Sequence, residues 1–114
     1  MKKIKDISEA LNLFQDAAIK HAEATEQGDY KIANKNYDTI AKTIEFLKQH
    51  NAICSLLEYL NHNSIGVKIW AATYLLPTNE KEATQVLEQI IREKGIQSFD
   101  AKMVLSEWGK GNLN

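Results

Sequence analysis

The sequence predicts an all-α fold of about six helices, which stack as antiparallel hairpins into a short, right-handed α-solenoid. Apolar residues recur along most of the chain at steps of three and four, which is the spacing of one helix face. No segment shows sustained two-residue alternation with β-branched enrichment, so the chain offers no candidate strands. The single proline and the five glycines lie at the expected helix boundaries and in the tail. At 114 residues, we expect one domain, residues 1–114.

The first 50 residues predict a helical hairpin. A stripe through Leu11 and Phe14 indicates the first helix, with Asp6 as its N-cap and Gly28 as its C-terminal residue. Asp6 and Glu9 have the spacing of a capping box. Asp29 can cap the second helix, and so short a connection favours antiparallel packing. The stripe of the second helix comprises Tyr30, Ala33, Tyr37, Ile40, Ile44 and Leu47.

Residues 51–77 predict a second hairpin, the first of two repeats. Its first helix begins at Asn51 and buries a run of leucines before "NHNS" ends it. Ser64 caps the next helix, which Pro77 terminates. In this helix, "IGVKIWAATYLLP", the small residues Ala71 and Ala72 allow close helix approach, and Trp70 fills the gaps beside them.

Residues 78–111 predict the second repeat. Asn79 and Glu82 have capping-box spacing, the fifth helix ends near Gly95, and Ser98 or Asp100 opens a sixth. A shift of 34 residues aligns the two repeats: it places Ser64 on Ser98, Val67 on Ala101, Lys68 on Lys102, Leu56 on Ile90 and Leu57 on Ile91. The expected core comprises Leu11, Phe14, Tyr37, Ile40, Ile44, Leu57, Leu60, Val67, Trp70, Ala71, Leu87, Ile90, Val104 and Leu105.

Two resemblances accompany this pattern. The stretch "VKIWAATYLL" resembles the second-helix signature of HEAT-type repeats, in which a valine and a basic residue precede paired alanines. Residues 17–40, residues 67–77 and residues 98–111 together resemble the bacterial family known as domain of unknown function 2019. The family resemblance implies a small all-α fold of the armadillo/HEAT class and no established activity.

Composition limits the classes of function. The formal net charge is −1 and the pI is near 6.3, so the chain has no overall positive field that would gather phosphate backbones. The N-terminal "MKKIK" is basic, but Asp6 and Glu9 interrupt any apolar stretch after it, so we expect neither an export signal nor a membrane span. Cys54 is the only cysteine, which favours a reducing cytoplasm, and its apolar neighbours predict that it is buried.

Polar residues interrupt the first hairpin's apolar packing. The stripe of the first helix continues to His21, and in an antiparallel hairpin that residue lies near Asn34, Tyr37 and Asp38. We expect a buried or half-buried polar cluster, which either locks the register of the hairpin or, with Glu26, binds a partner. Trp108, near the chain end, is a second candidate contact. The predicted partner-binding residues are His21, Glu26, Asn34, Asp38 and Trp108.

No catalytic motif is present in the sequence. It contains neither a nucleophile elbow nor a glycine-rich phosphate loop, and its three histidines lack the spacing of a zinc or di-iron site, so we expect no cofactor and no metal. The leading hypothesis is therefore a non-catalytic protein-binding helical-repeat module, possible roles including an immunity or antitoxin-like inhibitor of a partner protein. The alternatives are an enzyme that uses the cluster around His21, or a HEAT-like nucleic-acid-binding protein. The sequence does not specify an oligomeric state.

Overall fold

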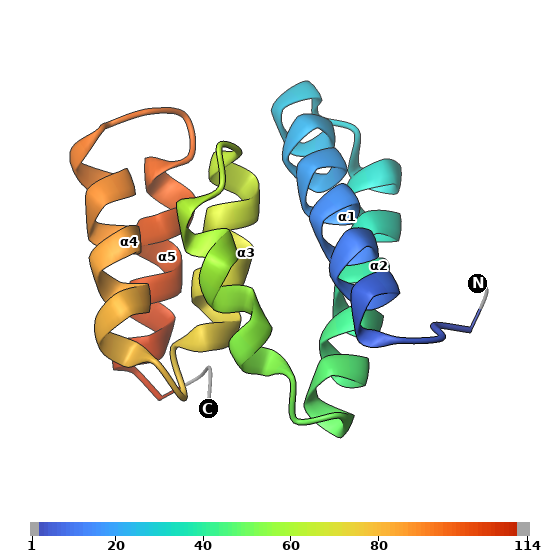
Figure 1. The fold of residues 1–114 in the computed structure, drawn as a ribbon. Helices are drawn as coiled ribbons and strands as arrows, with labels where there is room; N and C mark the ends of the chain where they lie inside the picture. The colour runs from blue at the N-terminus through green and yellow to red at the C-terminus, as the bar shows by residue number, and fades with distance from the viewer. Residues whose placement is uncertain (1–2, 112–114) are drawn as a thin grey trace. The chain divides into compact units, whose positions relative to one another are not determined.

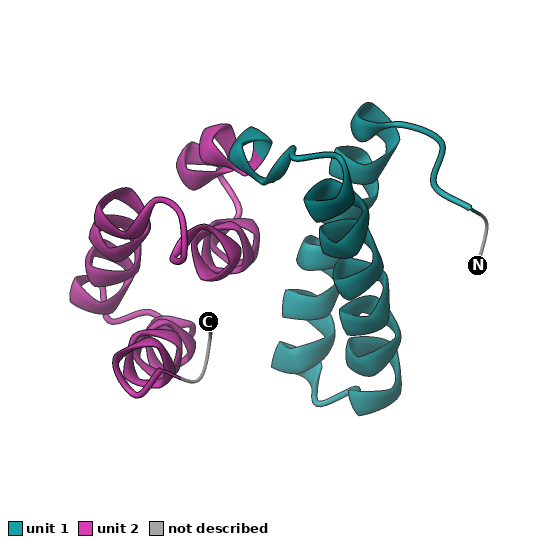
Figure 2. Ribbon diagram, turned by 90° about the horizontal axis from the view of Figure 1, so that it is seen from below, with its two compact units in different colours: residues 1–55 teal, residues 56–114 magenta. Residues whose placement is uncertain are grey.

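The computed structural model describes residues 3–111, and every regular element in that range is helical (Figure 1). The elements are α1 (Ile7–Gln27), α2 (Tyr30–Gln49), the 3₁₀ helix η1 (Ile53–Asn61), α3 (Ile65–Leu75), α4 (Glu80–Arg92) and α5 (Ser98–Gly109). The described chain is therefore all-α with six helices, as predicted. It divides between Ser55 and Leu56 into two compact units, coloured separately in Figure 2. The single domain composed of residues 1–50, 51–77 and 78–111 stays a prediction.

The first unit is the expected hairpin of α1 and α2, packed along their length. Its buried side chains include Phe14, Ile40, Ile44 and Leu47. The turn follows from local chemistry: Gly28 adopts the left-handed conformation at φ 73°, and Asp29 Oδ1 accepts the Ile32 backbone N–H at 3.2 Å. These two residues end one helix and start the next within two positions.

The start of α1 is capped differently from a reciprocal capping box. Asp6 Oδ1 accepts the backbone N–H of Glu9 at 2.8 Å, which confirms Asp6 as the N-cap. The Glu9 carboxylate, however, accepts the backbone N–H of Lys5 at 3.0 Å. The Glu9 side chain therefore pairs the backbone N–H of Lys5, the residue before the N-cap, and stabilises the chain segment that leads into the helix.

The third predicted helix is a 3₁₀ helix that begins two residues later than expected. Asn51 lies outside it with φ 54°, in the left-handed region that asparagine tolerates better than most residues. A 3₁₀ helix has three residues per turn, so Ile53, Leu56 and Tyr59 lie on one side, and Leu56 is fully buried. Cys54, which we expected to be buried, is exposed.

The stretch "IGVKIWAATYL" forms α3, as predicted. Its N-cap Ser64 accepts the Val67 N–H at 3.4 Å, and the Ser64 N–H in turn donates to His62 Nδ1 at 2.9 Å. Gly66, Val67, Ile69, Ala71, Ala72 and Leu75 are buried, so little of the helix faces water. Trp70, expected in the core, is only half-buried and stacks on Tyr74 with ring centroids 6.1 Å apart.

In the second unit, α3 packs on α4 and α4 on α5. Figure 1 shows the chain running in one direction in α3 and α5 and in the opposite direction in α4. The Asn79–Glu82 capping box is absent: Asn79 makes no side-chain cap bond, and its Nδ2 donates instead to the Glu82 carboxylate at 3.5 Å. The helix α5 begins at Ser98 without a side-chain cap.

Most of the residues that we expected in the core are buried. Phe14, Ile40, Ile44, Leu60, Val67, Ala71, Leu87 and Ile90 are buried. Leu11, Leu57, Trp70, Val104 and Leu105 are half-buried, and Tyr37 is exposed. The half-buried Val104 and Leu105 both belong to α5.

Candidate functional site

The outward side of α2 carries two tyrosines of the predicted apolar stripe, Tyr30 and Tyr37, of which Tyr37 was also expected in the core. Tyr30 is 75% exposed and Tyr37 is 47% exposed. Successive residues of an α-helix are about 100° apart, so Tyr30 lies about 60° round the helix from the buried Ala33. The same rotation separates Tyr37 from the buried Ile40. The apolar stripe is therefore narrower than its spacing suggests, and both tyrosines lie beyond its edge.

Asn34 and Asp38, two of the predicted site residues, lie beside these tyrosines. Both are exposed, and Asn34 is four positions from Tyr30 and three from Tyr37, which makes them neighbours on the helix surface. We call Tyr30, Asn34, Tyr37 and Asp38 the α2 surface. Asn36 and Thr39, at neighbouring positions, direct side-chain donors at backbone carbonyls of their own helix, those of Ile32 and Lys35.

His21 and Glu26, the other predicted residues of the first unit, belong to α1. His21 is half-buried, and its backbone carbonyl accepts a hydrogen bond from Thr25 Oγ1 at 2.9 Å. Glu26 is exposed one residue before the end of the helix. The expectation of a buried cluster is wrong for Asn34, Tyr37 and Asp38, which are exposed, whereas His21 is half-buried as expected.

Trp108 belongs to the second unit, so it is not part of the α2 surface. It is half-buried near the end of α5, and its indole Nε1–H donates to Glu80 Oε2 at 2.5 Å. This bond links α5 to the first turn of α4. The side chain therefore has a structural role within its own unit.

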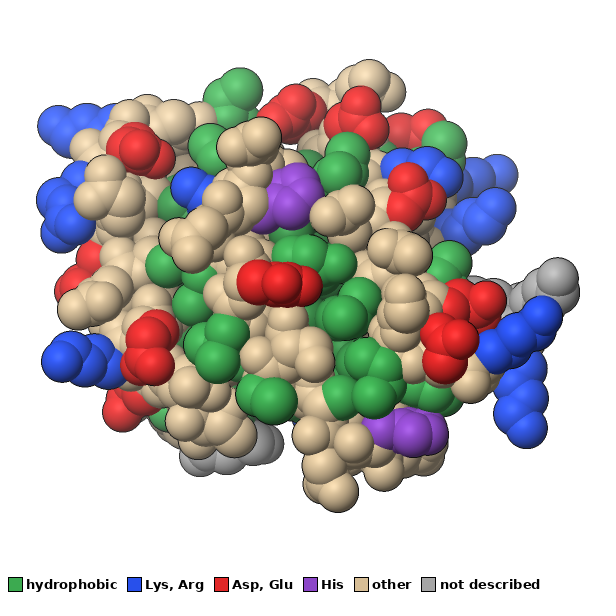
Figure 3. Space-filling view, in the orientation of Figure 1, with side chains coloured by type: hydrophobic (Ala, Val, Ile, Leu, Met, Phe, Trp, Pro, Cys, Tyr) green, Lys and Arg blue, Asp and Glu red, His purple; other side chains and the backbone are tan. Residues whose placement is uncertain are grey.

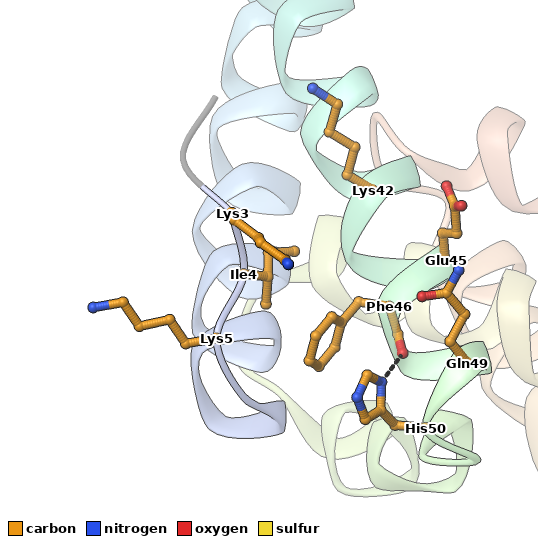
Figure 4. Close-up of a pocket in the computed structure, with 8 residues that line it drawn as sticks. All are labelled: Lys3, Ile4, Lys5, Lys42, Glu45, Phe46, Gln49 and His50. Carbon is orange, nitrogen blue, oxygen red and sulfur yellow. Dashed lines mark hydrogen bonds between the residues drawn. The ribbon is translucent and has the colours of Figure 1, made fainter.

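Sequence reasoning missed a pocket of about 550 Å³ in the first unit, shown in Figure 4. It is lined by Lys3, Ile4, Lys5, Lys42, Glu45, Phe46, Gln49 and His50. The rings of Phe46 and His50 stack with centroids 4.0 Å apart, and His50 Nδ1–H donates to the Phe46 carbonyl at 2.9 Å. The ammonium groups of Lys5 and Lys42 point away from these rings in Figure 4. The lysines therefore do not converge on one anion-sized position.

One tyrosine has a perturbed acidity. Burial, and next the carboxylate of Glu58, raise the pKa of Tyr59 above its usual value. Its ring meets that of His62 edge-on at 5.9 Å. Since His62 accepts the Ser64 N–H, this pair supports the start of α3 and is a structural feature.

The described residues show no ready metal centre. Within residues 3–111, no three His, Cys, Asp or Glu side chains lie close enough together to hold a metal ion. In the same range, no helix combines the length and apolarity that a bilayer span requires.

Comparison with known proteins agrees with the fold. No curated protein matches the sequence. A crystal structure of the protein RPA1889 from Rhodopseudomonas palustris CGA009 is similar, with a TM-score of 0.86 and 22% sequence identity over 96% of each chain. At that identity, the likeness concerns the fold alone. Residues 8–108 match the family described as "Domain of unknown function (DUF2019)", and this all-α chain belongs to that family.

Proposed function

We propose that the chain is a non-catalytic protein-binding module whose contact area is the α2 surface. The observation that carries this proposal is the exposure of Tyr30 and Tyr37 on either side of Asn34. Tyrosine supplies a large apolar contact with a polar tip at low cost in side-chain entropy, and it is enriched at interface hot spots. Asn34 and Asp38 add hydrogen-bonding groups that fix the register of a partner.

The proposed architecture is a short α-solenoid of the HEAT/armadillo type. It is supported by the successive packing of α3 on α4 and of α4 on α5, and by the 34-residue correspondence between the two repeats. Such stacks present extended surfaces that suit protein recognition. An inhibitor of a partner enzyme, of the immunity or antitoxin kind, is the sharper form of this proposal.

The charge distribution supports a protein partner over a nucleic acid. Carboxylates and basic side chains are interspersed on the face drawn in Figure 3, and the net charge is −1. A phosphate backbone is bound through clusters of lysine and arginine, and this chain has a single arginine, Arg92. For the location of the protein, the lone Cys54 supports a reducing compartment, and we propose the cytoplasm.

Affinity capture from the cells of origin tests the binding proposal. Wild-type protein is compared with a Tyr30→Ala, Tyr37→Ala variant and with a matched control, Gln85→Ala, Gln89→Ala, which alters two exposed residues of α4. We expect one stoichiometric protein that the wild type and the control retain and the tyrosine variant loses. Because all four side chains are exposed, each variant should keep the wild-type circular dichroism spectrum. Equal capture by all three proteins would contradict the assignment to the α2 surface.

A further inference from the structure

The outer side of α5 carries an apolar stripe that stands apart from the α2 surface. Phe99 and Met103 are 58% and 47% exposed, and Ile96, just before the helix, is 80% exposed. The spacing of four between Phe99 and Met103 places these two residues on one side of α5, and Ile96 lies in the turn that precedes the helix. The opposite side, which includes the buried Ala101 and the half-buried Trp108, faces the rest of the second unit.

The repeat alignment shows that this stripe is covered in the preceding repeat. The 34-residue shift places Ile69 of α3 on Met103, and Ile69 is only 7% exposed. It also places Ile65, which is half-buried, on the exposed Phe99. At both positions the side chain of α3 is more buried than its counterpart in α5, so α5 exposes apolar surface at positions that are covered in α3.

The residues around the stripe have the pattern of a parallel helix pair. In heptad notation within α5, Met103 takes an a position, Phe99 and Ser106 the d positions, Asp100 and Glu107 the e positions, and Lys102 a g position. The acidic residues therefore lie along one edge of the stripe and Lys102 along the other. We propose that α5 pairs in parallel with α5 of a second copy of this chain.

Charge complementarity favours this occupant and this orientation. When two copies of α5 pair in parallel about a two-fold axis along the helices, the basic edge of each copy faces the acidic edge of the other. Lys102 of one copy then faces Glu107 of the second copy, as g and e residues do in parallel coiled coils. An antiparallel pair would bring Lys102 near Lys102 and the acidic edges near each other. Parallel packing also matches the common chain direction of α3 and α5 (Figure 1).

The size of the stripe sets the expected strength of association. Stable complexes bury about 800 Å² on each partner, far more than three side chains supply. We therefore expect a weak dimer, with a dissociation constant on the order of micromolar or above. The pairing is independent of the α2 surface, so the two proposals fail or succeed separately.

Sedimentation equilibrium over a range of protein concentrations tests the pairing. The wild type should show a reversible monomer–dimer equilibrium, and Phe99→Glu should raise its dissociation constant at least about tenfold, because a charge then replaces the central aromatic contact. Phe99 is exposed, so this variant should fold normally. A wild type that remains monomeric at the highest soluble concentration, or a Phe99→Glu variant that associates equally well, would overturn the proposal.

Charge exchange tests the orientation. Lys102→Glu and Glu107→Lys should each weaken association several-fold, and the double variant should restore it, because each single change leaves like charges facing each other. Lys81→Glu, on the exposed side of α4, is the matched control and should leave the dissociation constant unchanged. Failure of the double variant to recover association would overturn the parallel arrangement.

Discussion

Trp108 donates its indole N–H to the carboxylate of Glu80, a residue 28 positions earlier. The bond joins the last turn of α5 to the first turn of α4, so it holds the end of one helix against the start of the other. A tryptophan that looks available for a partner in the sequence thus has a hydrogen-bond partner inside its own unit.

Replacing Trp108 by Phe should lower the free energy of unfolding by about 1 kcal/mol, because the ring remains but the donor is lost. Glu80→Gln keeps an acceptor and should cost less. In a double-mutant cycle with Glu80→Ala, measured by urea denaturation, the coupling energy should be about 0.5 kcal/mol or more. Additive effects of the two substitutions would show that the bond contributes nothing to stability.

Two glycines should respond in opposite directions to alanine. Gly28 has φ 73°, where a Cβ is strained, so Gly28→Ala should destabilise the protein by about 1 kcal/mol. Gly109 lies in α5 with nothing within 4 Å of an added Cβ, so Gly109→Ala should stabilise it by about 0.5 kcal/mol. Thermal unfolding of both variants measures the two effects. A shift of the same sign would contradict the assigned backbone conformations.

Asp29 and Asn79 precede helices in similar sequence contexts but differ in capping. Asp29 accepts the Ile32 N–H, so Asp29→Ala should cost about 1 kcal/mol of stability. Asn79 makes no side-chain cap bond, so Asn79→Ala should cost much less. Chemical denaturation of the two variants measures the difference in stability. Equal losses of stability would contradict the difference in capping.

Tyr59 predicts a loss of stability in alkaline solution. Its pKa is raised in the folded protein by burial and by Glu58, whereas the unfolded chain releases the phenolic proton near pH 10. The contribution of this group is therefore fully present below about pH 10 and is lost as the pH rises through the folded-state pKa. Tyr59→Phe should reduce this alkaline decline, measured by denaturation at several pH values. Tyr30→Phe, at an exposed position, is the control, and a decline that Tyr59→Phe leaves unchanged would contradict the account.

The helix boundaries were predictable because local chemistry sets them. Asp6, Asp29 and Ser64 cap helices in the structure as their sequence context indicates, and α3 ends shortly before Pro77. Asn79 was not predictable in this way, because its Oδ1, the atom that would accept a backbone N–H, accepts the Thr78 hydroxyl at 2.9 Å. Capping spacing identifies the residues that can form the bond, and competing side chains decide whether it forms.

Burial was less predictable than helix position. An apolar stripe fixes the direction of the buried side only to within about one residue, or 100° of rotation. Tyr30 and Tyr37 lie at the edge of that range, so the side on which α1 packs decides that they are exposed. The burial of Cys54 was also predicted wrongly, because apolar neighbours in the sequence do not fix the side to which a residue points.

The candidate site was likewise predictable from the sequence only in part. Asn34 and Asp38 were identified from the sequence, and the structure places them beside two exposed tyrosines that sequence reasoning placed on the apolar stripe of α2. The pocket beside Phe46 and His50 was not found, because it joins residues 3–5 to residues 42–50 and depends on where the chain before α1 lies against α2.

Site-specific photo-crosslinking in the cells of origin tests the central claim most directly. A photoreactive phenylalanine analogue replaces Asn34, at the centre of the α2 surface, and, in a matched control, Gln85 on the exposed side of α4. The account predicts one discrete protein adduct from position 34 and none from position 85. No adduct at position 34, or the same adducts from both positions, would contradict protein binding through the α2 surface.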